Sequence, residues 1–539
     1  MFILKQNLWS SNRKAKLTFK KLILFYFLSI VFFTASKSSY VLAKPNGLRD
    51  FLYNTSSGIY QAKLVKVDNL GEKRLSYVHK LISVPYAEKP DRFQLATPKK
   101  YEKGVHKIQE PIFCYQSVNI TAYGLFSLTE SPKMSEDCLR INLYIPVSDS
   151  VHLENMPVVV HIHGGSNMVG GASLFDGSIL ASYGKVIVAV INFRLSILGF
   201  LSDMTKKYPG NYGLRDQILA IKWIKQNCYI LNCDPNSITL WGHSAGAGNV
   251  NWLSLSSLSN KLFQRAVIQS GTSFNYWAQD KMPFDRYKAL KSYFNCSRLP
   301  DEHTIENGAM TKLIETCLTH VSLNDLFSFK FSLIDGPGPV YDGFLGNESL
   351  ISEKTPRKIL EKDSSMLNLD ILVGINAVEG FSFEGYFSSS AKFWTKNNFT
   401  NELTLTLERL SLLIREKCKQ NSIIANRLLI DEYYEKKVKA IIADQKYLNK
   451  DEAKQLKSIF LNGDIIFDTG FIELIKLLKE KNKTSKKKVN LFVYEYLHEN
   501  TGQQSNLKVF KQYLKNDYLL STHFDGIDLA LGMNSTFLF

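Results

Sequence analysis

Short apolar runs alternate with helical patterns in the middle of the chain. Residues 158–162 (VVVHI), 186–192 (VIVAVIN) and 237–241 (SITLW) are rich in β-branched side chains, which predicts three strands. Residues 217–227 carry apolar side chains at helical spacing and predict a helix before the third strand. Strands that are buried on both faces read as continuous apolar runs. The pattern therefore predicts an α/β fold, with a mostly parallel sheet flanked by helices.

The same alternation continues toward the C-terminus, with strand-like runs at residues 371–375 and 489–494. Helical patterns dominate residues 280–333 and 393–461, and we interpret them as insertions that cap the sheet rather than as separate domains. The sequence contains no internal repeat and no Pro- or Ser-rich linker. These features predict a single domain over residues 44–539.

Residues 1–43 have the organisation of a secretory signal. A basic segment at 13–21 precedes a mostly apolar segment at 22–35, and Val41-Leu42-Ala43 fits a cleavage site. The apolar segment is shorter than the about 20 residues that span a bilayer. A cleaved signal peptide is therefore the first interpretation, and a signal anchor that tethers the protein to the membrane is the alternative. Both predict a secreted or membrane-anchored extracellular protein.

The net charge of +16 raises the question of an acidic partner such as a membrane surface or nucleic acid. Much of the basic excess lies at the N-terminus and in residues 476–488 (KLLKEKNKTSKKK). A dense lysine run repels itself and gains little by packing, so we interpret the second segment as a solvated loop. No nucleic-acid-binding module accompanies it, and nucleic acid is not an expected partner.

Cysteines and glycosylation triplets agree with an oxidising compartment. Cys228 and Cys233 either close a small loop or stay reduced, and Cys418 is the odd cysteine. Two other couples flank loop-like stretches and are expected to be disulfides, Cys114–Cys138 and Cys296–Cys317. The expected N-glycan acceptors, each in an Asn-X-Ser/Thr triplet, are Asn54, Asn119, Asn295, Asn347, Asn398, Asn482 and Asn534.

The sharpest local signal is the sequence Gly-His-Ser-Ala-Gly at residues 242–246, directly after a predicted strand. A tight turn from strand to helix exposes and positions a serine hydroxyl for attack, and flanking glycines leave room for neighbouring segments. The amides at the start of the following helix favour negative charge. Ser244 is therefore the candidate nucleophile.

A second glycine-containing loop, residues 161–166 (HIHGGS), begins at the end of an earlier predicted strand. An acyl-transfer enzyme needs donors for the oxyanion that forms when a nucleophile attacks a carbonyl. Backbone N–H groups of this loop can supply them. A glycine turn that only connects two elements is the alternative, and the position of the loop before the Ser244 turn favours the catalytic interpretation.

Ordered motifs along most of the chain resemble the type-B carboxylesterase/cholinesterase family, from about residue 48 onward. The matching segments are residues 84–87 (VPYA) with 92–93 (RF), 135–139 (SEDCL) with 142–146 (NLYIP), 192–194 (NFR) through 199–201 (GFL), 209–217 (PGNYGLRDQ), 269–271 (QSG) and 341–343 (YDG). The resemblance implies an α/β-hydrolase that acts on a small-molecule carboxylic ester without a metal or cofactor.

The resemblance also assigns the partners of Ser244. Residues 372–380 (LVGINAVEG) are similar to the family segment that carries the acid, which makes Glu379 the candidate. His523 begins a degraded match to the histidine segment and is the candidate base. The chain order Ser, acid, His is the order that this fold uses. The family pattern places the oxyanion donors at the N–H groups of Gly165, Ser166 and Ala245.

The same family pattern implies features that do no chemistry. It agrees with the two disulfides paired above. It also implies two structural ion pairs, Arg92 with Glu136 and Arg194 with Asp216.

The chain departs from the family at several positions. Ser166 replaces a glycine and Asn167 replaces an aromatic residue, which predicts slower or more selective catalysis. His243 replaces the more usual glutamate before the nucleophile. Leu128 stands where a choline-binding aromatic ring is expected, which argues against an acetylcholinesterase. The chain stops at Phe539, where relatives continue, so the sequence leaves open whether the C-terminus is complete.

Two further functions compete with a general carboxylesterase. One is a catalytically weak or inactive adhesion or binding protein of the neuroligin-like branch, whose members keep the fold and lose a triad residue. The other is a cholinesterase. The presence of Ser244, Glu379 and His523 together favours the hydrolase.

Overall fold

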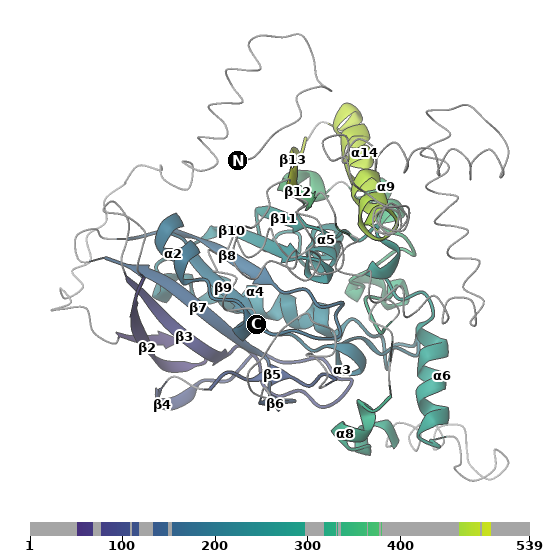
Figure 1. Ribbon diagram of the computed structural model, residues 1–539, viewed down its shortest axis with the longest axis horizontal. Helices are drawn as coiled ribbons and strands as arrows, with labels where there is room; N and C mark the ends of the chain where they lie inside the picture. The colour runs from purple at the N-terminus through teal and green to yellow at the C-terminus, as the bar shows by residue number, and fades with distance from the viewer. Residues whose placement is uncertain are drawn as a thin grey trace, which may run out of the picture.

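The computed structural model describes residues 51–67, 77–107, 110–117, 133–148, 153–296, 317–329, 331, 336–363, 365–376, 379, 463–485 and 488–496. A large mixed sheet runs through this part of the molecule (Figure 1), in the strand order β1-β2-β3-β7-β9-β8-β10-β11-β12-β13. Its strands are β1 (Phe51–Thr55), β2 (Gly58–Lys66), β3 (Tyr77–Pro85), β4 (Glu102–His106, paired with β2), β7 (Arg140–Val147), β8 (Met156–Ile162), β9 (Ile187–Ile191), β10 (Cys233–His243), β11 (Arg265–Gln269), β12 (Asp370–Asn376) and β13 (Asn490–Tyr496).

The half of the sheet from β9 to β13 is parallel throughout. The apolar runs at residues 158–162, 186–192 and 237–241 correspond to β8, β9 and β10, and the later runs at 371–375 and 489–494 correspond to β12 and β13. Strand β9 is buried along its whole length, as expected for a parallel strand covered on both faces. The α/β-hydrolase fold class predicted from the sequence is correct.

The other half of the sheet, from β1 to β9, is antiparallel, apart from the short parallel pairing of β4 with β2. These N-terminal strands face solvent on part of their surface. Strand β2 alternates buried and less buried positions, and β4 is mostly exposed. A separate two-stranded sheet joins β5 (Phe113–Cys114) and β6 (Met134–Ser135).

Helices cover both faces of the sheet, and β9 shows how the two faces are divided. Its residues Ile187, Ala189 and Ile191 belong to the core that packs under the long helices, whereas Val188 and Val190 belong to a second core on the opposite face. Successive side chains of a strand point to opposite faces, so this alternation places a helix layer on each side. The described helices are α2 (Ser178–Gly184), α3 (Ser196–Phe200), α4 (Tyr212–Leu231), α5 (Ala245–Leu255), α6 (Pro283–Tyr293), α8 (Leu323–Leu326), α9 (Pro356–Lys362) and α14 (Thr469–Thr484).

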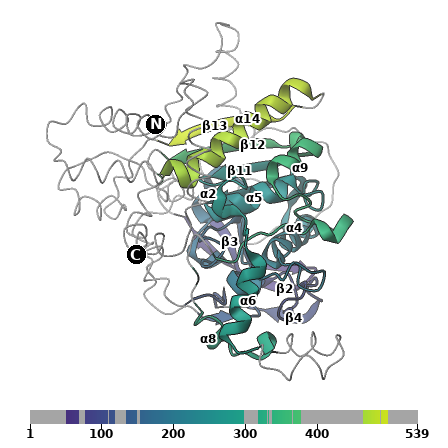
Figure 2. The same ribbon diagram turned by 90° about the vertical axis from the view of Figure 1, so that its right-hand side faces the viewer.

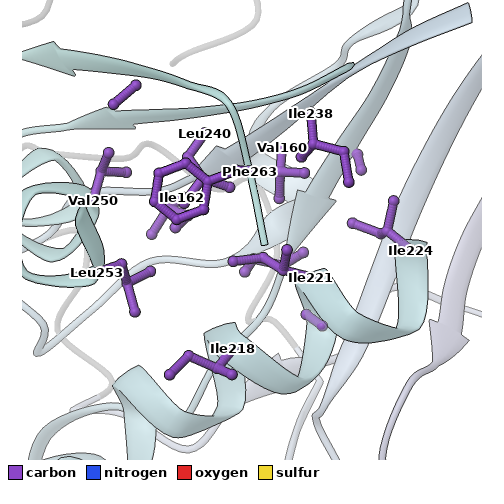
Figure 3. Close-up of a cluster of buried hydrophobic side chains, with 14 of the residues drawn as sticks. Val160, Ile162, Ile218, Ile221, Ile224, Ile238, Leu240, Val250, Leu253 and Phe263 are labelled. Atoms are coloured by element: carbon purple, nitrogen blue, oxygen red, sulfur yellow. The ribbon is translucent and has the colours of Figure 1, made fainter. Parts of the chain in front are cut away.

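The main core lies where α4 and α5 pack against the centre of the parallel sheet (Figure 3). The predicted helix at residues 217–227 is the central part of α4. Its isoleucines recur every three residues and form one buried stripe. The side chains that meet there are Ile218, Ile221 and Ile224 of α4, Val250 and Leu253 of α5, Val160 and Ile162 of β8, and Ile238 and Leu240 of β10.

The lysine-rich segment that we interpreted as a loop is for the most part a helix. Helix α14 ends at Thr484, so residues 476–484 lie within it, and β13 begins at Asn490. Leu474, Leu477 and Leu478 form a buried stripe at helical spacing, while the lysines take the other face. Figures 1 and 2 show α14 alongside α9, and Lys481 of α14 donates to the carbonyl of Glu361.

The predicted insertions are seen only in part. Helices α6 and α8 fall within residues 280–333 and lie at the end of the molecule opposite α14 (Figure 2). Residues 393–461 and the predicted signal segment at 1–43 lie outside the described residues. In the ranges that the structure does describe, no helix is both long enough and apolar enough to cross a bilayer.

Three disulfides stabilise the described chain. Cys114–Cys138 and Cys296–Cys317 join the couples that the sequence predicted. Cys228 and Cys233, which the sequence left open, form a third disulfide across the turn from α4 into β10. Cys418 lies outside the described residues.

Candidate active site

The candidate site lies where the sheet changes the direction of its connections. After β8 the chain crosses to β9 on one side, whereas after β10 it crosses to β11 on the other. The loops that leave these two neighbouring strands therefore diverge, and a crevice at their carboxyl ends is the usual ligand site of an open α/β sheet. Ile162 of β8 pairs with Gly242 of β10, so the predicted oxyanion loop and the predicted nucleophile begin side by side.

Ser244 occupies a strained turn between β10 and α5. Its backbone angles are φ 56° and ψ −125°, outside the regions that L-residues favour, and α5 begins at the next residue. Its N–H donates to the carbonyl of Gln269 at 2.9 Å, which ties the turn to the neighbouring strand β11. The residue is 8% exposed. These features are those of the elbow that presents a nucleophilic serine.

Glycine is required on both sides of this turn because backbone approaches closely. A Cβ on Gly242 would lie 2.2 Å from the carbonyl oxygen of Gly246. A Cβ on Gly246 would lie 2.1 Å from the carbonyl oxygen of Ile162, the last residue of β8. The Gly-His-Ser-Ala-Gly spacing therefore reflects contacts that no larger residue permits.

The loop after β8 lies directly against Ser244. A Cβ on Gly164 would be 3.0 Å from the Cβ of Ser244. The loop then turns through three consecutive residues with positive φ, namely Gly165 at 103°, Ser166 at 57° and Asn167 at 56°. Within the described ranges, the N–H groups of Gly165, Ser166 and Ala245 donate to no protein acceptor. These are the three N–H groups that the family pattern predicts as oxyanion donors.

Glu379 is buried at the carboxyl edge of the same sheet, three residues after β12 ends. Its Oε1 accepts hydrogen bonds from Ser270 Oγ and from the N–H of Asn376, each at 2.6 Å. Burial raises the pKa of the Glu379 carboxyl to about 7, while the two hydrogen bonds and the nearby His243 ring lower it. A carboxylate at this position needs a positive or donating partner to remain ionised near neutral pH.

The strand register explains why Ser270 and Glu379 meet at the edge of the sheet that also carries Ser244. His243 of β10 pairs with Gln269 of β11, and Gln269 pairs with Gly374 of β12. The segments that carry Ser244, Ser270 and Glu379 therefore leave three adjacent parallel strands at one edge. His523, the predicted base, and Leu128, the position expected to bind choline, lie outside the described residues.

Two other histidines near the site are buried and neutral. Burial holds the pKa of His163 at about 4, and its ring stacks on Phe193 with centroids 4.6 Å apart. Burial likewise holds the pKa of His161 well below its usual range. Neither ring is suited to accept a proton near pH 7. No group of three or more metal-ligating side chains occurs in the described part of the chain.

The residues of both predicted ion pairs are brought together. Arg194 donates from Nε and Nη2 to the two carboxylate oxygens of Asp216, at 2.8 and 2.7 Å, and both side chains are buried. Arg92 lies 2.7 Å from Glu136 in a less buried setting. Each arginine also donates to a backbone carbonyl, Arg92 to that of Thr319 and Arg194 to that of Gln94, so each pair holds a neighbouring backbone segment in place.

Two contributors to the site were not assigned a role from the sequence. Ser270 lies within the QSG motif, but the motif alone does not show that its hydroxyl reaches Glu379. The N–H of Asn376 carries no sequence signal because every residue except proline has one. Both are consequences of three strands ending at one edge.

Comparison with known proteins identifies the family. The family model described as "Carboxylesterase family" matches residues 66–535. The chain belongs to the carboxylesterase family.

Among curated carboxylesterase-family relatives, neuroligin-2 of Rattus norvegicus is 32% identical over 362 residues, which cover 62% of this chain and 41% of the relative. Acetylcholinesterase of Electrophorus electricus is 32% identical over 394 residues, with 66% of this chain and 58% of the relative covered. Carboxylesterase 3B of Mus musculus is 38% identical over 305 residues, with coverages of 55% and 50%. The chain thus spans between two fifths and three fifths of these carboxylesterase-family relatives.

Proposed function

We propose that the chain is a serine hydrolase of small-molecule carboxylic esters, with Ser244 as nucleophile, His523 as general base and Glu379 as the acid partner. The observation that carries the proposal is the contact between the Gly164 loop and Ser244 at the ends of β8 and β10. A strained serine next to a loop whose amides donate to no acceptor in the described ranges has the arrangement that acyl transfer needs.

In the proposed reaction, Ser244 Oγ bonds to the ester carbonyl carbon while its proton passes to the His523 ring. The carbonyl oxygen becomes an oxyanion that accepts hydrogen bonds from Gly165, Ser166 and Ala245. Collapse of this intermediate breaks the bond to the alkoxy oxygen, and the protonated His523 gives its proton to the leaving alcohol. Water, activated by the same ring, then attacks the acyl-enzyme and releases the acid.

Glu379 would orient His523 and stabilise its positive charge. The carboxylate is costly to bury alone, since burial raises its pKa to about 7. The Ser270 hydroxyl and the Asn376 N–H offset part of this cost by donating to the charged form. An imidazolium next to Glu379 would lower its pKa further, so the acid and the base support each other's charged states.

The proposed substrate class is a general, uncharged ester rather than a choline ester, because Leu128 replaces the expected aromatic ring. Acetylthiocholine and p-nitrophenyl acetate separate the two classes. A strong preference for p-nitrophenyl acetate supports the carboxylesterase, and a strong preference for acetylthiocholine would assign a cholinesterase.

A second candidate is a binding protein with weak or no catalysis, which the similarity to neuroligin-2 favours. Ser166 also favours weak catalysis, because it stands where the family pattern has a glycine and its side chain can crowd the acyl group of a substrate. Ser166 nevertheless retains its N–H group. The carboxylesterase proposal rests on the presence of all three triad residue types.

We also propose that residues 1–43 direct the chain into the secretory pathway, as a cleaved signal peptide or a membrane tether. Three disulfides agree with an oxidising compartment. Among the proposed glycan acceptors in the described ranges, Asn54, Asn295 and Asn347 are exposed. Asn482 is less accessible. Its Nδ2 donates to the carbonyl of Val489, and its Oδ1 accepts from the N–H of Val489.

Covalent labelling with a fluorophosphonate probe tests the proposed function. We expect labelling of the wild type, none of Ser244→Ala, and strongly reduced labelling of His523→Ala. Ser292→Ala is the matched control, because Ser292 is an exposed serine on α6 and its loss should leave labelling unchanged. A folded wild type that resists the probe would overturn the enzyme and favour the binding protein.

A further inference from the structure

Two asparagine side chains join the oxyanion loop to the nucleophile helix. Asn249 Nδ2 donates to Asn167 Oδ1 at 2.8 Å, and Asn167 Nδ2 donates to Asn249 Oδ1 at 3.3 Å. The two residues are 1% and 6% exposed, respectively. In this reciprocal pair each side-chain amide uses one donor and one acceptor. The two side chains can therefore be buried without leaving these groups unpaired.

Each member of the pair belongs to one half of the proposed oxyanion site. Asn167 follows Ser166 directly in the loop after β8. Asn249 lies in the second turn of α5, whose first residue is Ala245. The pair therefore spans the gap between the loop that carries two of the proposed amide donors and the helix that carries the third.

Asn167 is also held from a second direction. Its carbonyl accepts a hydrogen bond from the N–H of Ser196, at the start of α3, at 2.7 Å. Its own φ is 56° and that of Ser166 is 57°. Residues other than glycine remain in this region only where the surrounding contacts hold them, although asparagine tolerates it better than most. The amide pair and the Ser196 contact supply that constraint.

We propose that the Asn167–Asn249 pair positions the oxyanion loop against the nucleophile helix and so fixes the distance between the amides of Gly165 and Ser166 and the amide of Ala245. This inference rests on the proposed esterase function. An oxyanion hole requires donors about 2.7–3.1 Å from the developing charge, and small displacements of such groups reduce the rate strongly. Both asparagines are positioning residues, since neither is placed in contact with the substrate.

The test compares Asn249→Ala, Asn167→Gly and the double variant, with p-nitrophenyl acetate as substrate and a trifluoromethyl ketone as an analogue of the tetrahedral intermediate. Glycine at residue 167 removes the amide while keeping the left-handed backbone accessible. We expect each single variant to lose about 10- to 100-fold in kcat and in affinity for the ketone, with KM changed by less than about threefold. The double variant should be little worse than the poorer single variant, because both substitutions remove the same contact.

Asn227→Ala is the matched control for loss of a buried amide. Asn227 lies in α4, is 3% exposed, and donates to the Ser56 hydroxyl and the Trp223 carbonyl, away from the loop after β8. It should lower the denaturation midpoint as the site variants do, without changing kcat or ketone affinity. Unchanged ketone affinity in both site variants, or equal losses in Asn227→Ala, would overturn the positioning role.

The fluorophosphonate probe separates a failure of the positioning role from a failure of the esterase activity. A wild type that reacts with the fluorophosphonate probe, together with Asn249→Ala reacting at the same rate, overturns the positioning role alone. A wild type that does not react overturns the esterase and, with it, this inference.

Discussion

The Ser270 hydroxyl donates a 2.6 Å hydrogen bond to Glu379 Oε1, and so connects the end of β11 to the acid that follows β12. A hydroxyl that donates to a carboxylate stabilises the charged form and lowers its pKa. Glu379 needs such support because it is buried and its pKa is raised to about 7.

Ser270→Ala should move the acidic limb of the pH–activity profile to higher pH. Loss of one hydrogen bond to the charged carboxylate raises the pKa of Glu379 by about one unit. We expect kcat/KM to fall about tenfold near pH 6 and much less near pH 8. Ser273→Ala is the control, since the Ser273 hydroxyl donates to Asn251 rather than to Glu379. The same shift in both variants would contradict a specific role for Ser270.

Glu379→Gln should change how stability depends on pH. The carboxyl has a pKa of about 7 in the folded protein and about 4.3 in an unfolded chain. The stability contributed by the neutral form is therefore complete below about pH 4 and is lost as pH rises through about 7. Relative to wild type, Glu379→Gln should gain up to about 3 kcal/mol between pH 4 and pH 8. Urea denaturation across this range measures the difference, and parallel curves for the two proteins would count against it.

Two glycines of α5 should respond oppositely to alanine. The new Cβ of Gly246→Ala would meet the carbonyl oxygen of Ile162 at 2.1 Å, so the variant should misfold or lose probe labelling. The Cβ of Gly248→Ala finds no atom nearer than 3.5 Å, and alanine favours a helix over glycine by about 0.5–1 kcal/mol. We expect Gly248→Ala to retain labelling and at least wild-type stability. Similar behaviour of the two variants would show that the turn is less crowded than described.

The buried ion pair should matter more than the partly exposed one. Asp216→Asn leaves the Arg194 guanidinium buried without its counter-charge, which should cost about 3–5 kcal/mol of unfolding free energy. Glu136→Gln should cost about 1 kcal/mol, because Arg92 is better solvated and keeps its backbone acceptors. Chemical denaturation of both variants gives the comparison, and an equal loss would remove burial as the explanation.

The parallel half of the fold could be predicted from the sequence because strands such as β9 are buried on both faces and read as apolar runs. The antiparallel half could not, since β2 carries two exposed lysines and β4 carries an exposed glutamate and an exposed lysine. The lysine run at 476–488 was misinterpreted because its charge density hid the i, i+3, i+4 spacing of Leu474, Leu477 and Leu478.

The candidate site likewise contains residues that the sequence predicted and a contact that only the fold shows. Ser244 and the loop to Ser166 stand in compact motifs, and Glu379 was located only through the family resemblance. The Asn167–Asn249 contact joins residues 82 positions apart. Nothing in the local sequence of either residue indicates the other, so only the folded sheet reveals it.

The strands after β10 join the sheet in chain order, each outside the one before, from β11 to β13. A chain that emerges from the ribosome N-terminus first can thus pair β10 with β8 before the segment bearing Glu379 has been made. Until β13 is added, β12 forms the open parallel edge of the growing sheet, which other chains could join. The turn that carries Ser244 can consequently form early in synthesis, whereas Glu379 is added late, so a partly made chain holds the proposed nucleophile without its proposed acid partner.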